Sequence, residues 1–255
     1  MARLRPVAHE DRLTLVEHLD ELRTRIIVCL AVLAVAMGLC FWQNDLLLDI
    51  AQAPLPDDRE QLTTFGVTEP FTTTLTVSAY FAILLSLPIL LYQLFAYILP
   101  AFSDQERRTV MPFLLLIPVL FLAGVAFAYF VVMPPALSFL TDFNDDQLNI
   151  QLRAREYYSF FVTMLAAMGL IFEVPMAILA VTRLGIVTPD QLAQNRRYAI
   201  LVIAVVAMLL PSVDPITMLI EMIPLIVLFE LSILLARAFG TSGGRAASEP
   251  STQEP

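Results

Sequence analysis

The sequence predicts an all-α polytopic membrane protein with six transmembrane helices in a curved bundle. Of its 255 residues, 58% are hydrophobic and 15% are charged, whereas a soluble domain has roughly 45–50% apolar and about 25% charged residues. The mean hydropathy of +0.75 agrees with this composition. These values exclude a soluble globular enzyme, and the net charge of -9 argues against a nucleic-acid partner.

Six apolar runs are long enough to cross a membrane or approach that length. A bilayer core of about 30 Å requires about 20 helical residues. The predicted spans are 26–42, 71–99, 110–133, 157–181, 198–210 and 216–236. The fifth run is short, so it either thins the bilayer or is a re-entrant or tilted packing helix. We expect residues 1–237 to form one membrane domain and 238–255 to form a disordered cytoplasmic tail.

The arginines predict the orientation of these spans, because positive residues gather in cytoplasmic loops. With both termini cytoplasmic, the outer loops hold only Arg59, Arg153 and Arg155. The other twelve lie inside: Arg3, Arg5, Arg12, Arg23, Arg25, Arg107, Arg108, Arg183, Arg196, Arg197, Arg237 and Arg245. Acidic residues precede the first run, which favours a retained span over a cleaved signal peptide.

Prolines interrupt most of the predicted spans. Each proline removes a helix hydrogen bond and bends its segment unless neighbouring groups satisfy the freed carbonyl. The residues concerned are Pro88, Pro112, Pro118, Pro175 and Pro224. The bundle is therefore predicted to be curved.

A few polar residues are candidates for function, and each also has a simpler structural interpretation. An amphipathic helix leads into the first span, and there Glu21 has the i,i+4 spacing for a pair with Arg25. Glu106 has the spacing of a capping box with Ser103. Glu173 lies within an apolar span, so it is either a functional group facing the bundle interior or a structural carboxyl beside Pro175.

Motifs for catalysis or cofactor binding are missing from the sequence. It has no phosphate-binding loop, no dinucleotide fingerprint and no metal-ligand spacing, so we expect neither enzyme activity nor a cofactor. Cys29 and Cys40 are about 16 Å apart along a helix, too far for a disulfide. One alternative function is a proton-coupled secondary transporter of a small solute that uses Glu173, although the sequence shows no internal repeat.

Several stretches together resemble the TatC family, the core receptor subunit of the twin-arginine protein translocase. The resemblance covers roughly residues 13–237. It is carried by TLVEHLDELRTR (14–25), LPILLYQ (87–93), ERR (106–108), AFAYF (126–130), FEVP (172–175) and RRYA (196–199).

The resemblance implies a six-helix, cup-shaped receptor that recognises an Arg-Arg pair in the signal peptides of folded precursors. Glu21 and Glu106 would hold the two arginines, with Arg23 and Tyr97 also in the signal-peptide site, while Glu173 would face the concave side. Implied partners are TatA/TatB-type single-span subunits along the fifth and sixth helices and further copies of the chain. The implied location is the bacterial inner membrane, with export driven by the proton gradient or the membrane potential.

The predicted partner-docking positions match the family's pattern only in part. Pro54 and Asp214 match positions of the family's characteristic set. The chain reads Pro211-Ser212-Val213-Asp214 where many relatives read Thr-Pro-Pro-Asp, and it has Met218 where a glutamine is frequent. We expect Glu221, one turn further along, to replace that missing polar group.

Overall fold

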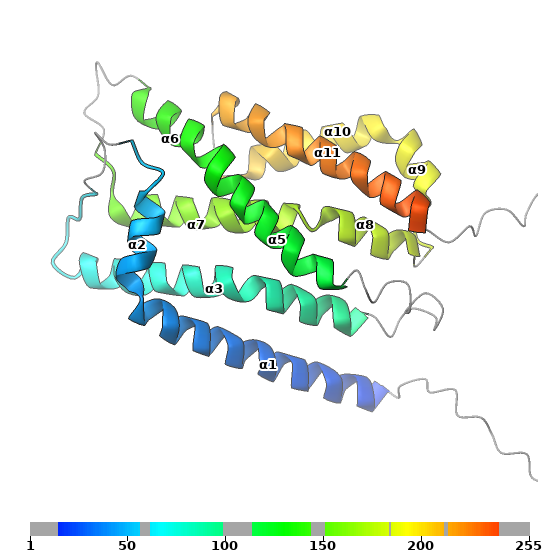
Figure 1. Ribbon diagram of the computed structural model, residues 1–255, viewed down its shortest axis with the longest axis horizontal. Coiled ribbons are helices and arrows are strands. Elements are labelled where there is room, and N and C mark those ends of the chain that lie inside the picture. Colours follow the sequence, from blue (N-terminus) through cyan, green and yellow to red (C-terminus); the bar gives the residue numbers. More distant parts are fainter. Residues whose placement is uncertain are drawn as a thin grey trace, which may run out of the picture.

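The computed structural model describes residues 15–56, 62–98, 114–143, 151–183, 185–211 and 214–239. All the regular elements in these residues are helices, which confirms the predicted fold class (Figure 1). The one β-type pairing within these described residues is an isolated bridge between Thr63 and Arg153.

Helices α1 and α3 lie side by side and contain the first two predicted spans. α1 (Leu15–Trp42) runs without a break from the amphipathic segment through the first apolar run. After α2 (Asn44–Gln52) the chain turns into α3 (Glu69–Ile98), which contains Pro88. α1 packs mainly on α3, so most of its apolar surface is exposed.

The third span extends past its predicted end at residue 133. It consists of α5 (Leu116–Phe127), the π-helical turn η4 (Ala128–Val132) and α6 (Met133–Asp142). Pro134 and Pro135 stand at the start of α6 and cannot donate backbone hydrogen bonds. The preceding π-helical turn is typical of the way a helix accommodates such an interruption.

The fourth span is broken near its middle. α7 (Ala154–Ile171) ends just before Glu173, and α8 (Val174–Arg183) continues in a similar direction (Figure 1). Pro175 follows the break, as expected from its missing backbone donor. Half of the residues in the most apolar 18-residue stretch of this span are buried, compared with 6% in the corresponding stretch of α1. α7 and α8 therefore form the centre of the bundle.

The last elements are α9 (Pro189–Gln194), α10 (Arg196–Leu209) and α11 (Pro215–Phe239). Five helical stretches of the described residues are long and apolar enough to cross a membrane. α10 is shorter, with 14 residues that extend over only about 21 Å. α10 covers most of the short fifth run, 198–210.

The two ends of the bundle are formed by different helix ends and carry different numbers of the described arginines. The first end, on the right of Figure 1, holds the start of α1, the end of α3, the start of α5 and the ends of α8 and α11. It also holds α9 and the start of α10. The second end holds α2 and the starts of α3 and α7. Of the eight arginines in the described residues, six belong to elements at the first end: Arg23, Arg25, Arg183, Arg196, Arg197 and Arg237. Arg153 and Arg155 lie at the second end.

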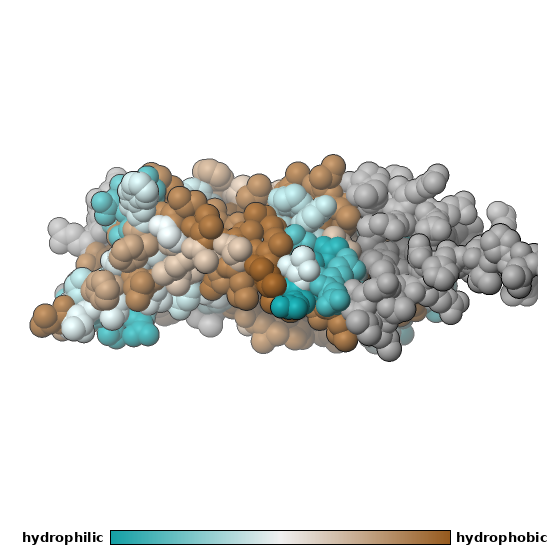
Figure 2. All heavy atoms as spheres, turned by 90° about the horizontal axis from the view of Figure 1, so that it is seen from below, coloured by the Kyte–Doolittle hydropathy of each residue, from teal (hydrophilic) through white to brown (hydrophobic). Residues whose placement is uncertain are grey.

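The surface of the bundle suits an apolar solvent. Figure 2 shows the face on which α1 lies, with hydrophobic residues along its middle and hydrophilic residues towards the two ends. Many large apolar side chains of α1 are exposed, among them Ile27, Leu30 and Val35. Such a continuous apolar surface is expected against lipid rather than water.

A close approach between α5 and α7 holds the centre together. A Cβ atom added at Gly124 would come within 2.6 Å of the Met168 carbonyl oxygen and 2.9 Å of the Phe172 Cβ. A Cβ added at Gly169 would meet the Phe121 ring at 2.6 Å. The contact therefore requires glycine at both positions, and it brings Phe121 next to the segment that carries Glu173.

Candidate functional site

A polar cluster lies between α1 and α3 at the first end, and we call it the rim site. It consists of His18, Glu21 and Arg25 from α1 and Gln93 and Tyr97 from α3. The α1 residues lie three and four positions apart, so they share one face of the helix. On α3, Gln93 and Tyr97 are likewise four residues apart and face α1.

Arg25 joins the two helices of the rim site. Its Nε and Nη2 atoms donate to Glu21 Oε1, at 3.0 and 2.5 Å. Its Nη1 atom donates to Gln93 Oε1 at 2.7 Å, 68 residues away in the sequence. The predicted i,i+4 pair is therefore present, and α3 supplies a second partner that spacing within α1 could not reveal.

The second oxygen of Glu21 faces an aromatic pair. Glu21 Oε2 is 3.8 Å from His18 Nδ1. The His18 and Tyr97 rings stack, with their centroids 4.3 Å apart and their planes inclined by 11°. The side chain of Glu21 is 27% exposed, so solvent and ligands can still reach the carboxylate.

The structure thus brings together some of the predicted signal-peptide residues. Glu21 and Tyr97 share the rim site through His18. Arg23 is on α1 nearby, but its side chain is exposed and it makes no ion pair with any described residue. Glu106 lies outside the described residues, so its distance from Glu21 stays a prediction. His18 and Gln93 were missed as site residues, although each lies three or four positions from a predicted one.

Glu173 occupies the break between α7 and α8. Its side chain is buried, and neither carboxylate oxygen has a hydrogen bond of good geometry among the described residues. Its own carbonyl accepts a hydrogen bond from the Ala177 amide at 3.0 Å. The carboxyl group does not cap the break itself, so the functional and structural interpretations both remain.

Asp214 has a clear structural contact at the start of α11. Its Oδ1 atom accepts a hydrogen bond from the Thr217 backbone amide at 2.7 Å, and the residue is 4% exposed. This is the geometry of an N-cap. Glu221 is fully buried two turns further along α11.

Replacing Asp214 by alanine is expected to lower the free energy of unfolding by about 0.5–2 kcal/mol, because the cap hydrogen bond is lost. Asp214→Asn keeps a side-chain oxygen and should preserve most of the stability. Thermal unfolding of the purified variants in detergent measures the difference. Equal melting temperatures for Asp214→Ala and the unchanged chain would contradict the capping role.

Pro54 lies in a turn that three tyrosines hold in place at the second end. Tyr129 donates its hydroxyl to the Ile50 carbonyl at 3.0 Å, and Tyr157 donates to the Ala51 carbonyl. Gln52 donates its side-chain amide to the Tyr158 hydroxyl at 2.6 Å. The contacts satisfy polar groups at the end of α2, just before Pro54. Nothing in the local sequence pattern links these tyrosines to α2, so their contacts were not predicted.

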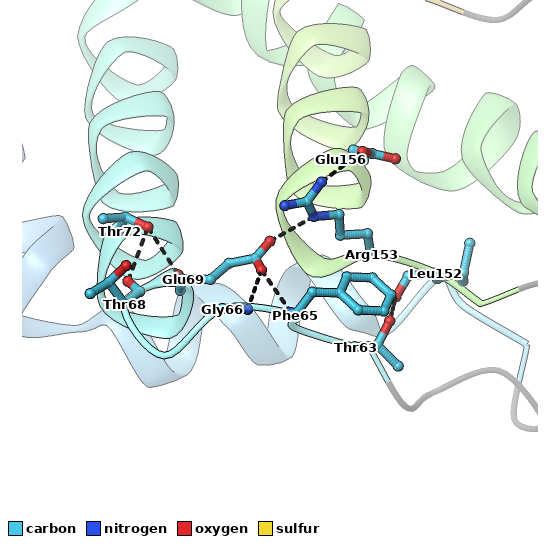
Figure 3. Close-up of polar contacts among 9 residues, drawn as sticks. All are labelled: Thr63, Phe65, Gly66, Thr68, Glu69, Thr72, Leu152, Arg153 and Glu156. Atoms are coloured by element: carbon cyan, nitrogen blue, oxygen red, sulfur yellow. Dashed lines mark hydrogen bonds and ion pairs between the residues drawn. The ribbon is translucent and has the colours of Figure 1, made fainter.

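A second group of contacts at this end was also missed (Figure 3). Glu69 Oε1 accepts a hydrogen bond from Arg153 Nε at 2.6 Å, and its Oε2 accepts from the amides of Phe65 and Gly66 at 2.7 and 3.0 Å. The Glu69 carboxylate is the main cause that raises the pKa of Arg153 above its ordinary value. Thr63 pairs with the backbone on either side of Arg153. We call Glu69 and Arg153 the Glu69–Arg153 clamp.

The fold defines a polytopic α-helical membrane protein, and in its rim site the carboxylate of Glu21 accepts hydrogen bonds from the guanidinium of Arg25. Comparison with known protein families identifies the family. The family model for Sec-independent protein translocase protein (TatC) matches residues 17–224. The chain therefore belongs to the TatC family.

Individual relatives agree with this assignment. The Sec-independent protein translocase protein TatC of Escherichia coli K12 is 35% identical over 238 residues, which cover 92% of each chain. That of Desulforapulum autotrophicum is 33% identical over 234 residues, which cover 91% of this chain and 87% of the relative. A crystal structure of the twin arginine translocase receptor TatC superposes with a TM-score of 0.73 at 32% identity, covering 88% of this chain and 99% of that one.

Membership of this family makes the chain a non-enzymatic component of a protein translocase. It also favours protein export over the alternative of a small-solute transporter.

Proposed function

We propose that this chain is the receptor and core subunit of twin-arginine protein export in the bacterial inner membrane. Both termini are cytoplasmic, so the first end faces the cytoplasm and receives the signal peptide of a folded precursor. The excess of described arginines at the first end supports this orientation.

The proposal depends mainly on the contact between Glu21 and a guanidinium group in the rim site. Its carboxylate already accepts two hydrogen bonds from a guanidinium group, that of Arg25. A guanidinium presents several donors in one plane, which fits a carboxylate better than the point charge of an ammonium. The rim site is therefore chemically suited to an arginine of a signal peptide.

Glu106 supplies the second carboxylate in this proposal. In the sequence it lies between α3, which ends at the first end, and α5, which begins there (Figure 1). That arrangement supports a position near Glu21. Tyr97 and Arg23 border the same site, since Tyr97 stacks on His18 and Arg23 is on α1.

The remaining predicted residues have roles within the membrane. Glu173, buried at the α7–α8 break, contacts the inserted signal peptide from the concave side. TatA/TatB-type single-span subunits dock along α10 and α11, near Pro54, Asp214 and Glu221, and several copies of the chain assemble into one complex. The exposed apolar side chains of α10, such as Leu201 and Val205, support docking of a partner helix there.

Binding of a signal peptide to the purified chain tests the proposal. A peptide with the Arg-Arg pair should bind at least about ten-fold more tightly than the same peptide with Lys-Lys, because lysine keeps the charge but lacks the planar donors. Fluorescence anisotropy at several salt concentrations measures both affinities, which should fall as salt rises. Equal affinities for the two peptides would contradict the proposed recognition.

A further inference from the structure

The guanidinium of Arg25 is hydrogen-bonded to the carboxylate that the proposed ligand needs. Both of its donors to Glu21 reach the same oxygen, Oε1. The pair is partly shielded from solvent, since the Arg25 side chain is 23% exposed and that of Glu21 is 27% exposed. An arginine from a signal peptide therefore meets a carboxylate that is already engaged.

Arg25 also has a second set of acceptors, all on α3. Its Nη1 atom donates to the side-chain oxygen of Gln93 at 2.7 Å and lies 3.5 Å from the Gln93 carbonyl oxygen. Its Nη2 atom lies 3.4 Å from the Ala96 carbonyl oxygen. When another guanidinium takes Glu21, Arg25 can keep these contacts, so displacement does not leave it without hydrogen bonds.

We propose that Arg25 is an internal competitor of the signal-peptide arginine, and that Gln93 holds Arg25 when Glu21 is taken over. The inference rests on the proposed function of Glu21. Competition of this kind lowers the apparent affinity by the same factor for every ligand that must displace Arg25, and it acts mainly by slowing association. Arg25 thus sets the affinity of the rim site without contacting the precursor.

A neutral replacement of Arg25 provides the first test. In Arg25→Gln, a twin-arginine signal peptide should bind the full chain roughly two- to five-fold more tightly, the range expected for a partly exposed ion pair. The association rate should rise while the dissociation rate stays nearly constant, as surface plasmon resonance can measure.

Two further variants make the test specific. Gln93→Glu keeps Arg25 but gives it a carboxylate of its own, so it should also tighten binding. Arg237→Gln is the matched control, because it lowers the net charge by the same amount at the first end and removes only an exposed contact with Asp190. The effects of Arg25→Gln and Gln93→Glu should both exceed that of Arg237→Gln.

The outcomes separate this inference from the proposed function. If Arg25→Gln or Gln93→Glu weakens binding, or matches the control, while Glu21→Gln still reduces it, Arg25 is not a competitor and only the inference fails. If Glu21→Gln leaves binding unchanged, the rim site is not the receptor site and both fail. Should Arg25→Gln not fold, Gln93→Glu still decides, because it keeps the Arg25 side chain.

Discussion

A receptor with glutamine in place of Glu21 is expected to bind a twin-arginine signal peptide about ten- to hundred-fold more weakly than the unchanged chain. Glutamine has nearly the same size and keeps one acceptor oxygen, but it loses the charge that strengthens hydrogen bonds to guanidinium. Fluorescence anisotropy with a labelled peptide measures the change. Adding Glu106→Gln should remove most of the remaining affinity.

The matched control for this prediction is Glu230→Gln. Glu230, on α11, forms an ion pair with Arg196 at 2.7 Å. Like Glu21, it is a solvent-accessible carboxylate near the first end, and 42% of its side chain is exposed. Its loss should leave peptide binding almost unchanged. A similar reduction in Glu230→Gln and Glu21→Gln would mean that general charge, rather than the rim site, attracts the peptide.

The second large effect is expected at the Glu69–Arg153 clamp. Glu69→Ala removes the hydrogen bonds to Arg153, Phe65 and Gly66 together. Two backbone donors then lose their acceptor, and Arg153 loses its main counter-charge, so the segment 62–66 is held to the start of α7 less firmly, through the backbone pairing of Thr63. The melting temperature should fall by several degrees, and limited proteolysis should cut this segment faster.

Glu156→Ala is the control for the clamp. Glu156 contacts the same arginine at 3.5 Å, but its side chain is 74% exposed, and exposed ion pairs add little stability. It should behave like the unchanged chain. If Glu69→Ala is equally stable and equally resistant to protease, the clamp does not hold the second end together.

Several features of this protein could be predicted from the sequence, because they depend on residues close together in the chain. An apolar run of span length is visible without any partner, so the long helices and the short α10 were expected. The Glu21–Arg25 pair follows from helical spacing. The break before Pro175 follows from its missing amide.

Other features depended on how the helices pack. Gln93 lies 68 residues from Arg25, and Arg153 lies 84 residues from Glu69. The stacking of His18 on Tyr97 and the tyrosine contacts with the end of α2 join segments in the same way. Helical periodicity states which residues share a face, but it does not state which face of another helix they meet. That choice is made by the close packing of whole helices, such as the contact through Gly124, and it was decided only in the tertiary structure.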